Sequence, residues 1–224
     1  MSRSLCQCFL VSLASFILVI LIVVLFVWFR LSEPLDIPPS RIGFLQVSPQ
    51  LKTGDLLAIS YSSIRGKLVK VFTGSMWTHL GLVYRNRQGE IYVVEAALYP
   101  DKEGVIRTPL SEWKNWNMGR IVAYASLIGP PISDEAMEDA LSKVSGCSVD
   151  MCVLNWFLTT FRLEYREGHR GKFFCSELVA YLLQQLGVIE KQYRPTSYSP
   201  KDFIFSRIKM SPSYSYQEPY HILL

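Results

Sequence analysis

The chain has 224 residues, of which 50% are hydrophobic, 19% charged and 13% aromatic. This composition excludes a disordered, highly charged polypeptide. The 23 Lys and Arg residues outnumber the 19 Asp and Glu residues only slightly, so the net charge does not by itself indicate a nucleic-acid partner. The mean hydropathy of +0.19 is high for a soluble domain. We expect this excess to be local, because the first thirty residues carry almost no charge.

Residues 9–29 form the most apolar segment and contain no charged residue, Pro or Gly. At 1.5 Å per residue they would make about 31 Å of helix, which matches the hydrocarbon core of a bilayer. The alternative is a secretory signal peptide, whose apolar region is shorter and is followed by small residues rather than by Val27-Trp28-Phe29-Arg30. The sequence therefore predicts a retained single-pass transmembrane helix that has the lipid bilayer as its partner and follows an N-terminal flank at 1–8.

Basic residues give a weak indication of membrane orientation. Arg3 precedes the predicted span, whereas Arg30 and Arg41 follow it, which favours a cytoplasmic position for the C-terminal part by a margin of one residue. Cys6 and Cys8 lie just outside the span, where they are either S-acylated or unmodified thiols.

The five cysteines do not indicate a disulfide framework, because their number is odd and their spacing irregular. No N-x-Ser/Thr site marks an extracellular chain either. Cys147 and Cys152 have no nearby His, so we interpret them as buried apolar side chains rather than zinc ligands. We expect no metal and no organic cofactor.

The remainder of the chain divides into a spacer, a domain and a tail. Residues 30–47 contain Pro34, Pro38 and Pro39, which is typical of an extended linker. We expect the folded domain at 48–206. Residues 207–224 are rich in Tyr, Ser and Pro without a period, and they are expected to lie across the domain surface or to be disordered.

Within the domain, strand patterns precede most helix patterns. Asn86-Arg87-Gln88-Gly89 is a strong hairpin signal between two β-rich runs, and Ser133 is a candidate N-cap. This order favours an α+β domain with an antiparallel sheet and packed helices. The expected strands are residues 55–60, 79–84, 91–97, 105–108 and 121–126, and the expected helices are residues 64–72, 133–145, 151–163 and 176–186.

His79 and Glu95 are expected to meet across the predicted hairpin. A turn centred between Arg87 and Gln88 brings residue 79 opposite residue 95 or 96, so the imidazole and the carboxylate can share one sheet face. Such a carboxylate fixes the tautomer of a histidine and supports its protonated form, as a general base requires. The alternative is a Glu95 that faces solvent from an edge strand.

Cys175 is the candidate nucleophile. It precedes the predicted helix 176–186, and a helix N-terminus favours the thiolate and can stabilise an oxyanion. A packed core cysteine is the alternative. Together with His79 and Glu95, however, Cys175 completes the three roles of a cysteine acyl-transfer site.

These residues lie in motifs that resemble the YiiX-like branch of the NlpC and papain-like cysteine hydrolases, which is circularly permuted so that His precedes Cys. The resemblance covers roughly residues 50 to 205. It rests on Thr53-Gly54-Asp55-Leu56-Leu57, Thr73-Gly74-Ser75, Thr78-His79-Leu80-Gly81-Leu82-Val83, Val93-Val94-Glu95-Ala96, Phe174-Cys175-Ser176-Glu177-Leu178-Val179 and Ser199-Pro200-Lys201-Asp202-Phe203.

The resemblance implies a permuted papain-like (NlpC-type) fold and a catalytic triad, with Cys175 as nucleophile, His79 as base and Glu95 orienting His79. His169 is the second candidate imidazole, although the glycines on both sides favour a loop. Tyr61 follows the first predicted strand and is either a structural tyrosine, which we favour, or a residue that lines the site. Asp55 is expected to be a turn residue and Glu177 a first-turn carboxylate.

We therefore expect a membrane-anchored cysteine hydrolase or acyltransferase that cleaves an amide or ester through a thioester on Cys175. A peptide, peptidoglycan or a lipid would serve as substrate. Lipid acyl transfer is secondary, because the Asn-Cys-Glu-His signature of lecithin:retinol acyltransferase-like proteins is absent around Cys175. The alternative is an inactive scaffolding or binding protein, and nucleic-acid binding is disfavoured because the basic residues are scattered.

Overall fold

The structure is a computed structural model that describes residues 16–25, 37–99, 101–152, 171–205 and 207–224. It divides into two compact units, Met1–Leu35 and Asp36–Leu224. Each unit is treated by itself below.

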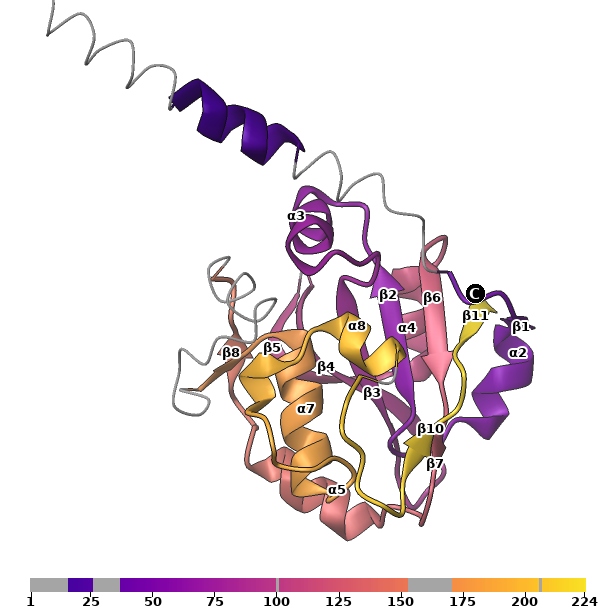
Figure 1. Cartoon of the computed structure of the whole chain (residues 1–224). Coiled ribbons are helices and arrows are strands. Elements are labelled where there is room, and N and C mark those ends of the chain that lie inside the picture. The colour runs from indigo at the N-terminus through magenta and orange to yellow at the C-terminus, as the bar shows by residue number, and fades with distance from the viewer. Residues whose placement is uncertain (1–15, 26–36, 100, 153–170, 206) are drawn as a thin grey trace, which may run out of the picture. The chain divides into compact units, whose positions relative to one another are not determined.

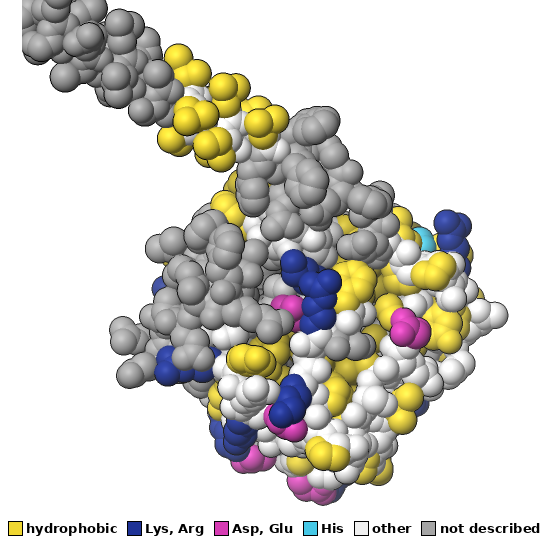
Figure 2. All heavy atoms as spheres, in the orientation of Figure 1, with side chains coloured by type: hydrophobic (Ala, Val, Ile, Leu, Met, Phe, Trp, Pro, Cys, Tyr) yellow, Lys and Arg dark blue, Asp and Glu magenta, His cyan; other side chains and the backbone are white. Residues whose placement is uncertain are grey.

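In the first unit, residues 16–25 are helical and all ten side chains are hydrophobic, as the space-filling view shows (Figure 2). Their exposed fractions run from 46% at Ile20 to 64% at Phe16. Within the described parts of the chain, no helix is both long enough and apolar enough to cross a bilayer. The rest of the predicted span at 9–29 lies outside the described residues, so the membrane anchor stays a prediction.

The second unit is built on a sheet whose seven described strands have the order β1-β11-β6-β2-β3-β4-β5 (Figure 1). Neighbouring strands are antiparallel, except that β1 runs parallel to β11. The predicted α+β class with an antiparallel sheet is thus confirmed. The strands are β1 (Arg41–Gly43), β2 (Leu56–Ser60), β3 (His79–Arg85), β4 (Ile91–Tyr99), β5 (Lys102–Pro109), β6 (Ile121–Ala125) and β11 (Tyr220–Leu223).

Helices cover both faces of this sheet. Leu56 and Ala58 of β2 face a core shared with α5 (Asp134–Ser142), α7 (Cys175–Gln185) and α8 (Pro200–Ile204). Leu57 and Ile59 point to the opposite face, where α2 (Phe44–Val47) and α4 (Leu110–Asn117) contribute to a second core. Burial on both faces explains why β2 is a continuous apolar run.

The remaining described elements lie outside this sheet. They are η1 (Ser48–Gln50), α3 (Ile64–Thr73), η2 (Pro195–Ser197), β7 (Leu127–Ile128) paired with β10 (Ser215–Tyr216), and β8 (Ser148–Val149) paired with β9 (Lys172–Phe173).

Local capping explains where the predicted helices begin and end. The Ser133 hydroxyl accepts a hydrogen bond from the amide of Ala136 at 3.1 Å, so Ser133 is the N-cap of α5 as expected. Ser63 caps α3 in the same way, accepting from the amide of Gly66 at 3.2 Å. The chain leaves α7 at Gly187, which has a φ of 69°.

The folded unit is larger than the predicted 48–206 at both ends. Residues 41–43, expected in the 30–47 linker, form β1. Residues 220–223, expected in a surface or disordered tail, form β11 between β1 and β6. Both expectations failed for the same reason: these short strands form by pairing with partners far away in the sequence rather than from a local pattern.

Two further expectations concern residues 147–163. The predicted helix at 151–163 falls largely outside the described residues. Cys147 is half-buried and packs against the first core, as expected, but Cys152 is exposed, which corrects its interpretation as a buried apolar side chain.

Candidate active site

His79 and Glu95 lie together at the start of β3 and in the middle of β4. The Nε2 atom of His79 is 2.7 Å from Oε2 of Glu95. The hairpin register, in which Arg85 pairs with Ile91, centres the turn on Gln88 rather than between Arg87 and Gln88. Extending that register puts His79 opposite residue 97, so the two side chains meet as diagonal neighbours on one face and not as the predicted direct pair.

Glu95 is fully buried, which excludes the alternative of an edge-strand carboxylate facing solvent. Its second oxygen, Oε1, accepts hydrogen bonds from the hydroxyls of Tyr99 at 3.0 Å and Thr108 at 3.5 Å. A buried carboxylate requires such partners. Because β4 lies between β3 and β5, Glu95 receives partners from both neighbouring strands.

Cys175 is the first residue of α7, and α7 packs against β3 and β4. Its half-buried side chain lies beside the His79 ring: both residues line the same cavity, and the thiol contributes to raising the pKa of His79. Since Nε2 of His79 is engaged by Glu95, the opposite ring nitrogen, Nδ1, is the one left for the thiol. The structure therefore brings all three predicted site residues together in the order Cys175, His79, Glu95.

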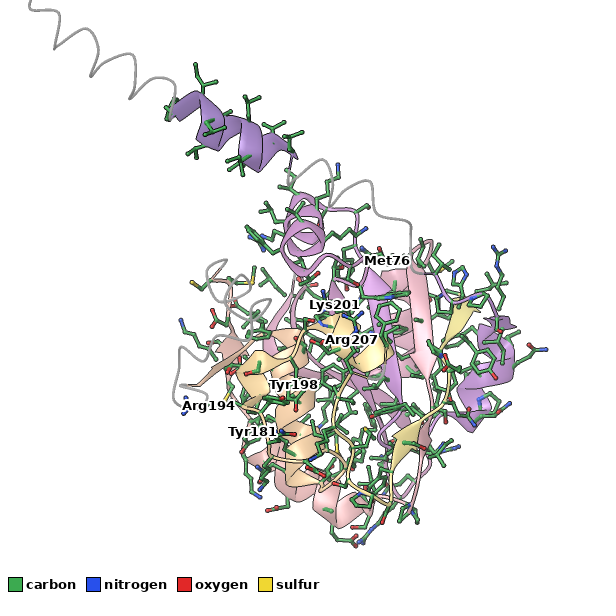
Figure 3. The ribbon with its side chains drawn as sticks, in the orientation of Figure 1. Met76, Tyr181, Arg194, Tyr198, Lys201 and Arg207 are labelled. Carbon is green, nitrogen blue, oxygen red and sulfur yellow. The ribbon has the colours of Figure 1, made fainter. Side chains whose placement is uncertain are left out.

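The start of α7 is held firmly. The carboxylate of Glu177 accepts a hydrogen bond from the amide of Phe174 at 3.4 Å, and the hydroxyl of Ser176 donates to the carbonyl of Tyr198 at 2.7 Å. Glu177 therefore caps the helix, in addition to its expected favourable position in the first turn. Figure 3 shows Tyr198 beside α7.

The surroundings of His79 favour its protonated form. Burial of the ring lowers the pKa of His79, but the interactions with Tyr61, Cys175 and Glu95 outweigh it and hold that pKa well above the ordinary 6.5. An imidazolium between a thiol and a carboxylate is the arrangement that stabilises a thiolate nucleophile.

A cavity of about 470 Å³ opens onto these residues. Its wall is mostly apolar, with Arg65, Arg120 and Asp150 as its charged residues. Both Cys175 and His79 line it, whereas Glu95 lies behind His79 and does not. The nucleophile and the base are thus accessible to a substrate, and the carboxylate is shielded from it.

Tyr61 lines this cavity, which favours the alternative of a site-lining residue over the preferred interpretation of a structural tyrosine. Its ring centroid lies 5.6 Å from that of His79, and its hydroxyl donates to Oδ1 of Asn117 at 3.3 Å. The Arg120 guanidinium lies over the Tyr61 ring, 4.3 Å from its centroid.

A second tyrosine, Tyr99, was missed by the sequence reasoning. Burial, together with the nearby Glu95 and Tyr61, raises the pKa of Tyr99. Its hydroxyl therefore stays protonated and donates to Glu95. The predicted strand 91–97 ended two residues too early, whereas β4 extends to Tyr99, four residues beyond Glu95 and hence on the same face.

The other candidates have different positions. His169 lies outside the described residues. Asp55 is fully buried and accepts from the amide of Lys52 at 3.0 Å, as a turn residue does, but it also accepts from the amide of Leu127 at 2.8 Å. Within the described ranges, no group of three or more His, Cys, Asp or Glu side chains is arranged to hold a metal.

Comparison with protein families gives a match over residues 50–202 to the permuted papain-like amidase family of YaeF and YiiX, the C92 peptidases. The chain belongs to this family. Membership in an amidase family supports a cysteine hydrolase that acts on an amide-containing substrate. The matched range contains Cys175, His79 and Glu95.

The chain is also similar to a solved structure, the metalloprotein YiiX from Escherichia coli O157:H7. The two are 18% identical, the alignment covers 75% of this chain and 97% of that one, and the TM-score is 0.46. A comparison with curated proteins gave no match.

Proposed function

We propose that this member of the permuted papain-like amidase family is an active cysteine hydrolase whose triad is Cys175, His79 and Glu95. The observation that carries the proposal is the placement of Cys175 and His79 together on one cavity, with Nε2 of His79 lying 2.7 Å from the buried Glu95 carboxylate. Each member has the environment that its role requires. Cys175 lies at a helix start, His79 has a raised pKa, and Glu95 is buried and hydrogen-bonded.

In the proposed reaction the Cys175 thiolate adds to the carbonyl carbon of an amide. The carbon–nitrogen bond then breaks as His79 gives its proton to the departing nitrogen, which leaves a thioester on Cys175. A water molecule then attacks the thioester carbonyl carbon, and His79 takes up a proton from this water molecule. The carbon–sulfur bond breaks, which releases a carboxylic acid and restores the thiolate. An ester would be cleaved in the same way, with oxygen as the leaving atom.

Two features assist these steps. The amides in the first turn of α7 have no acceptor inside the helix and lie next to Cys175, where they can stabilise the negative oxygen of the tetrahedral intermediate. Glu95 stabilises the imidazolium and fixes the ring so that Nδ1 faces the thiol.

We further propose that residues 9–29 anchor the chain in a bilayer, with the hydrolase domain on the cytoplasmic side. The support for the anchor is the length and composition of this segment, and the exposed apolar helix formed by its residues 16–25. The cytoplasmic side rests on the Lys and Arg count alone. Acyl transfer to another acceptor is the alternative fate of the same thioester, and the identity of the product distinguishes it from hydrolysis.

The test compares two cysteines within one chain. Cys175 is half-buried and Cys152 is exposed, so accessibility alone predicts faster alkylation at Cys152. We expect iodoacetamide, followed by peptide mass spectrometry, to modify Cys175 faster by about tenfold or more. We expect His79→Ala to abolish that difference. Equal or slower modification of Cys175 in the wild type would instead support a catalytically inactive binding protein.

A further inference from the structure

Helix α3, which forms one wall of the cavity, presents an apolar face to solvent. Ile64 and Leu68 lie one turn apart, and their side chains are 80% and 39% exposed. Large apolar side chains that are this exposed, and that neighbour one another, mark an interaction surface rather than ordinary surface variation.

The same helix carries only positive charge. Its sequence, IRGKLVKVFT, contains Arg65, Lys67 and Lys70 and no acidic residue. Burial and the nearby Lys67 lower the pKa of Lys70, as expected where like charges gather. A helix with apolar residues on one face, flanked by cations, has the pattern of a helix that lies in the interface of an anionic bilayer.

The inner side of α3 is fixed to the domain, so its outer face cannot turn inward. Gly66 packs so closely on Tyr61 that a Cβ atom there would lie 2.5 Å from the Tyr61 carbonyl oxygen. At the other end of the helix, the carbonyl of Thr73 accepts a hydrogen bond from Nζ of Lys201 on α8, a residue marked in Figure 3. Packing therefore leaves Ile64 and Leu68 exposed.

Exposed apolar side chains also line the cavity. Leu98 of β4 and Met151 both line the cavity and are 47% and 37% exposed. Arg65 and Gly66 of α3 line it as well. The surface that would touch a bilayer thus adjoins the entrance to the site of Cys175.

Given the proposed anchor, chain length adds a further argument. Residues 30–35, which separate the predicted span from the domain, reach at most about 20 Å when fully extended. In Figure 1, α3 and residues 37–40, where the described part of the domain begins, both lie at the upper end of the domain. A chain anchored by residues 9–29 would therefore keep this end of the domain close to the lipid surface.

We propose that α3 docks on a bilayer containing anionic lipids, with Ile64 and Leu68 in the interface and Arg65 and Lys67 at the headgroups, so that the cavity opens toward the membrane. This inference rests on the proposed anchor and not on the proposed catalysis. It identifies the bilayer surface as the place where the site meets its substrate.

The experiment uses the full chain in phosphatidylcholine vesicles with and without phosphatidylglycerol. The photoreactive residue p-benzoylphenylalanine replaces Ile64, or Leu45 of α2, which is 82% exposed and serves as the matched apolar control. A third probe at Leu18 reports on the anchor itself. Lipid adducts are quantified by mass spectrometry after illumination.

We expect abundant adducts at position 18 in both membranes. Adducts at position 64 should exceed those at position 45 several-fold, and only when phosphatidylglycerol is present. Adding Lys67→Glu should lower the position-64 adducts by about threefold or more, whereas Lys191→Glu, at an exposed lysine outside α3, should not.

Adducts at position 18 with equal yields at positions 64 and 45 would overturn the docking of α3 and leave the anchor intact. An absence of adducts at position 18 would overturn the anchor and this inference together. Neither result bears on the reactivity of Cys175, which is measured separately.

Discussion

The carboxylate of Glu95 lies 2.7 Å from Nε2 of His79 and is fully shielded from solvent. The negative charge that supports the imidazolium is therefore inside the domain and behind the histidine, out of contact with substrate. Removing this charge without changing the shape of the side chain tests what it contributes.

Glu95→Gln should slow the alkylation of Cys175 by about tenfold or more, because the neutral amide no longer stabilises a charged His79 and so the thiolate loses its partner. The second-order rate constant with iodoacetamide at pH 7 measures this. Glu103→Gln changes an exposed carboxylate on the neighbouring strand and should leave the rate unchanged. Equal rates for wild type and Glu95→Gln would contradict the role given to Glu95.

The raised pKa of His79 also predicts how stability depends on pH. Above about pH 6.5, where an unfolded histidine loses its proton, folded His79 keeps it, so the folded state binds more protons. This contribution to the free energy of unfolding is fully present below pH 6.5 and is lost as the pH rises toward the folded pKa. The loss is at most about 1.4 kcal/mol per pH unit.

Urea unfolding between pH 6 and pH 9 should show this fall of the free energy of unfolding with pH in the wild type and a shallower fall in His79→Gln. Parallel slopes would show that His79 does not carry a raised pKa.

Tyr99→Phe removes the 3.0 Å hydrogen bond to Glu95 and should cost about 1–3 kcal/mol of stability, because a buried carboxylate oxygen loses a donor. Tyr92→Phe is the matched control: its hydroxyl bonds to an exposed carboxylate, that of Glu90, and its removal should cost much less stability. Chemical denaturation of both variants measures the difference. A similar cost for both would mean that Tyr99 does not support Glu95.

The C-terminal strand offers a test with adjacent residues. Ile222 is 1% exposed and packs in the second core, whereas Leu223 is 51% exposed. Ile222→Ala should destabilise the domain by about 2–5 kcal/mol, and Leu223→Ala by less than about 0.5 kcal/mol. Thermal or urea unfolding of the two variants gives the comparison. If Ile222→Ala were as mild as Leu223→Ala, residues 220–223 would be a surface tail after all.

The parts of the fold that the sequence predicted are those with a local signal. The Ser133 cap, the turn around Gln88 and the helical spacing after Cys175 each mark an element within a few residues of the chain. The triad candidates also had local signals. His79 and Glu95 lie on the two strands of one predicted hairpin, and Cys175 lies at the start of one predicted helix.

The missed features depend on distant partners. Tyr61 looked structural because its contacts with His79 and Asn117 come from packing of separate elements. The strand at 220–223 has no period of its own and is specified by β1 and β6 on its two sides. Asp55 gave a turn signal, but nothing near it in sequence indicates the hydrogen bond to Leu127.

The position of β1 at the edge of the sheet has a mechanical consequence. The chain enters the domain through β1, and β11, β6 and β2 separate this strand from β3, which carries His79. A pull on the N-terminal segment would load the contact of Ile37 with the first core and then the three residue pairs between β1 and β11. Such a force could peel that edge strand away while the contacts among Cys175, His79 and Glu95 stay unstrained. The sheet would thus act as a mechanical buffer between the proposed anchor and the proposed triad.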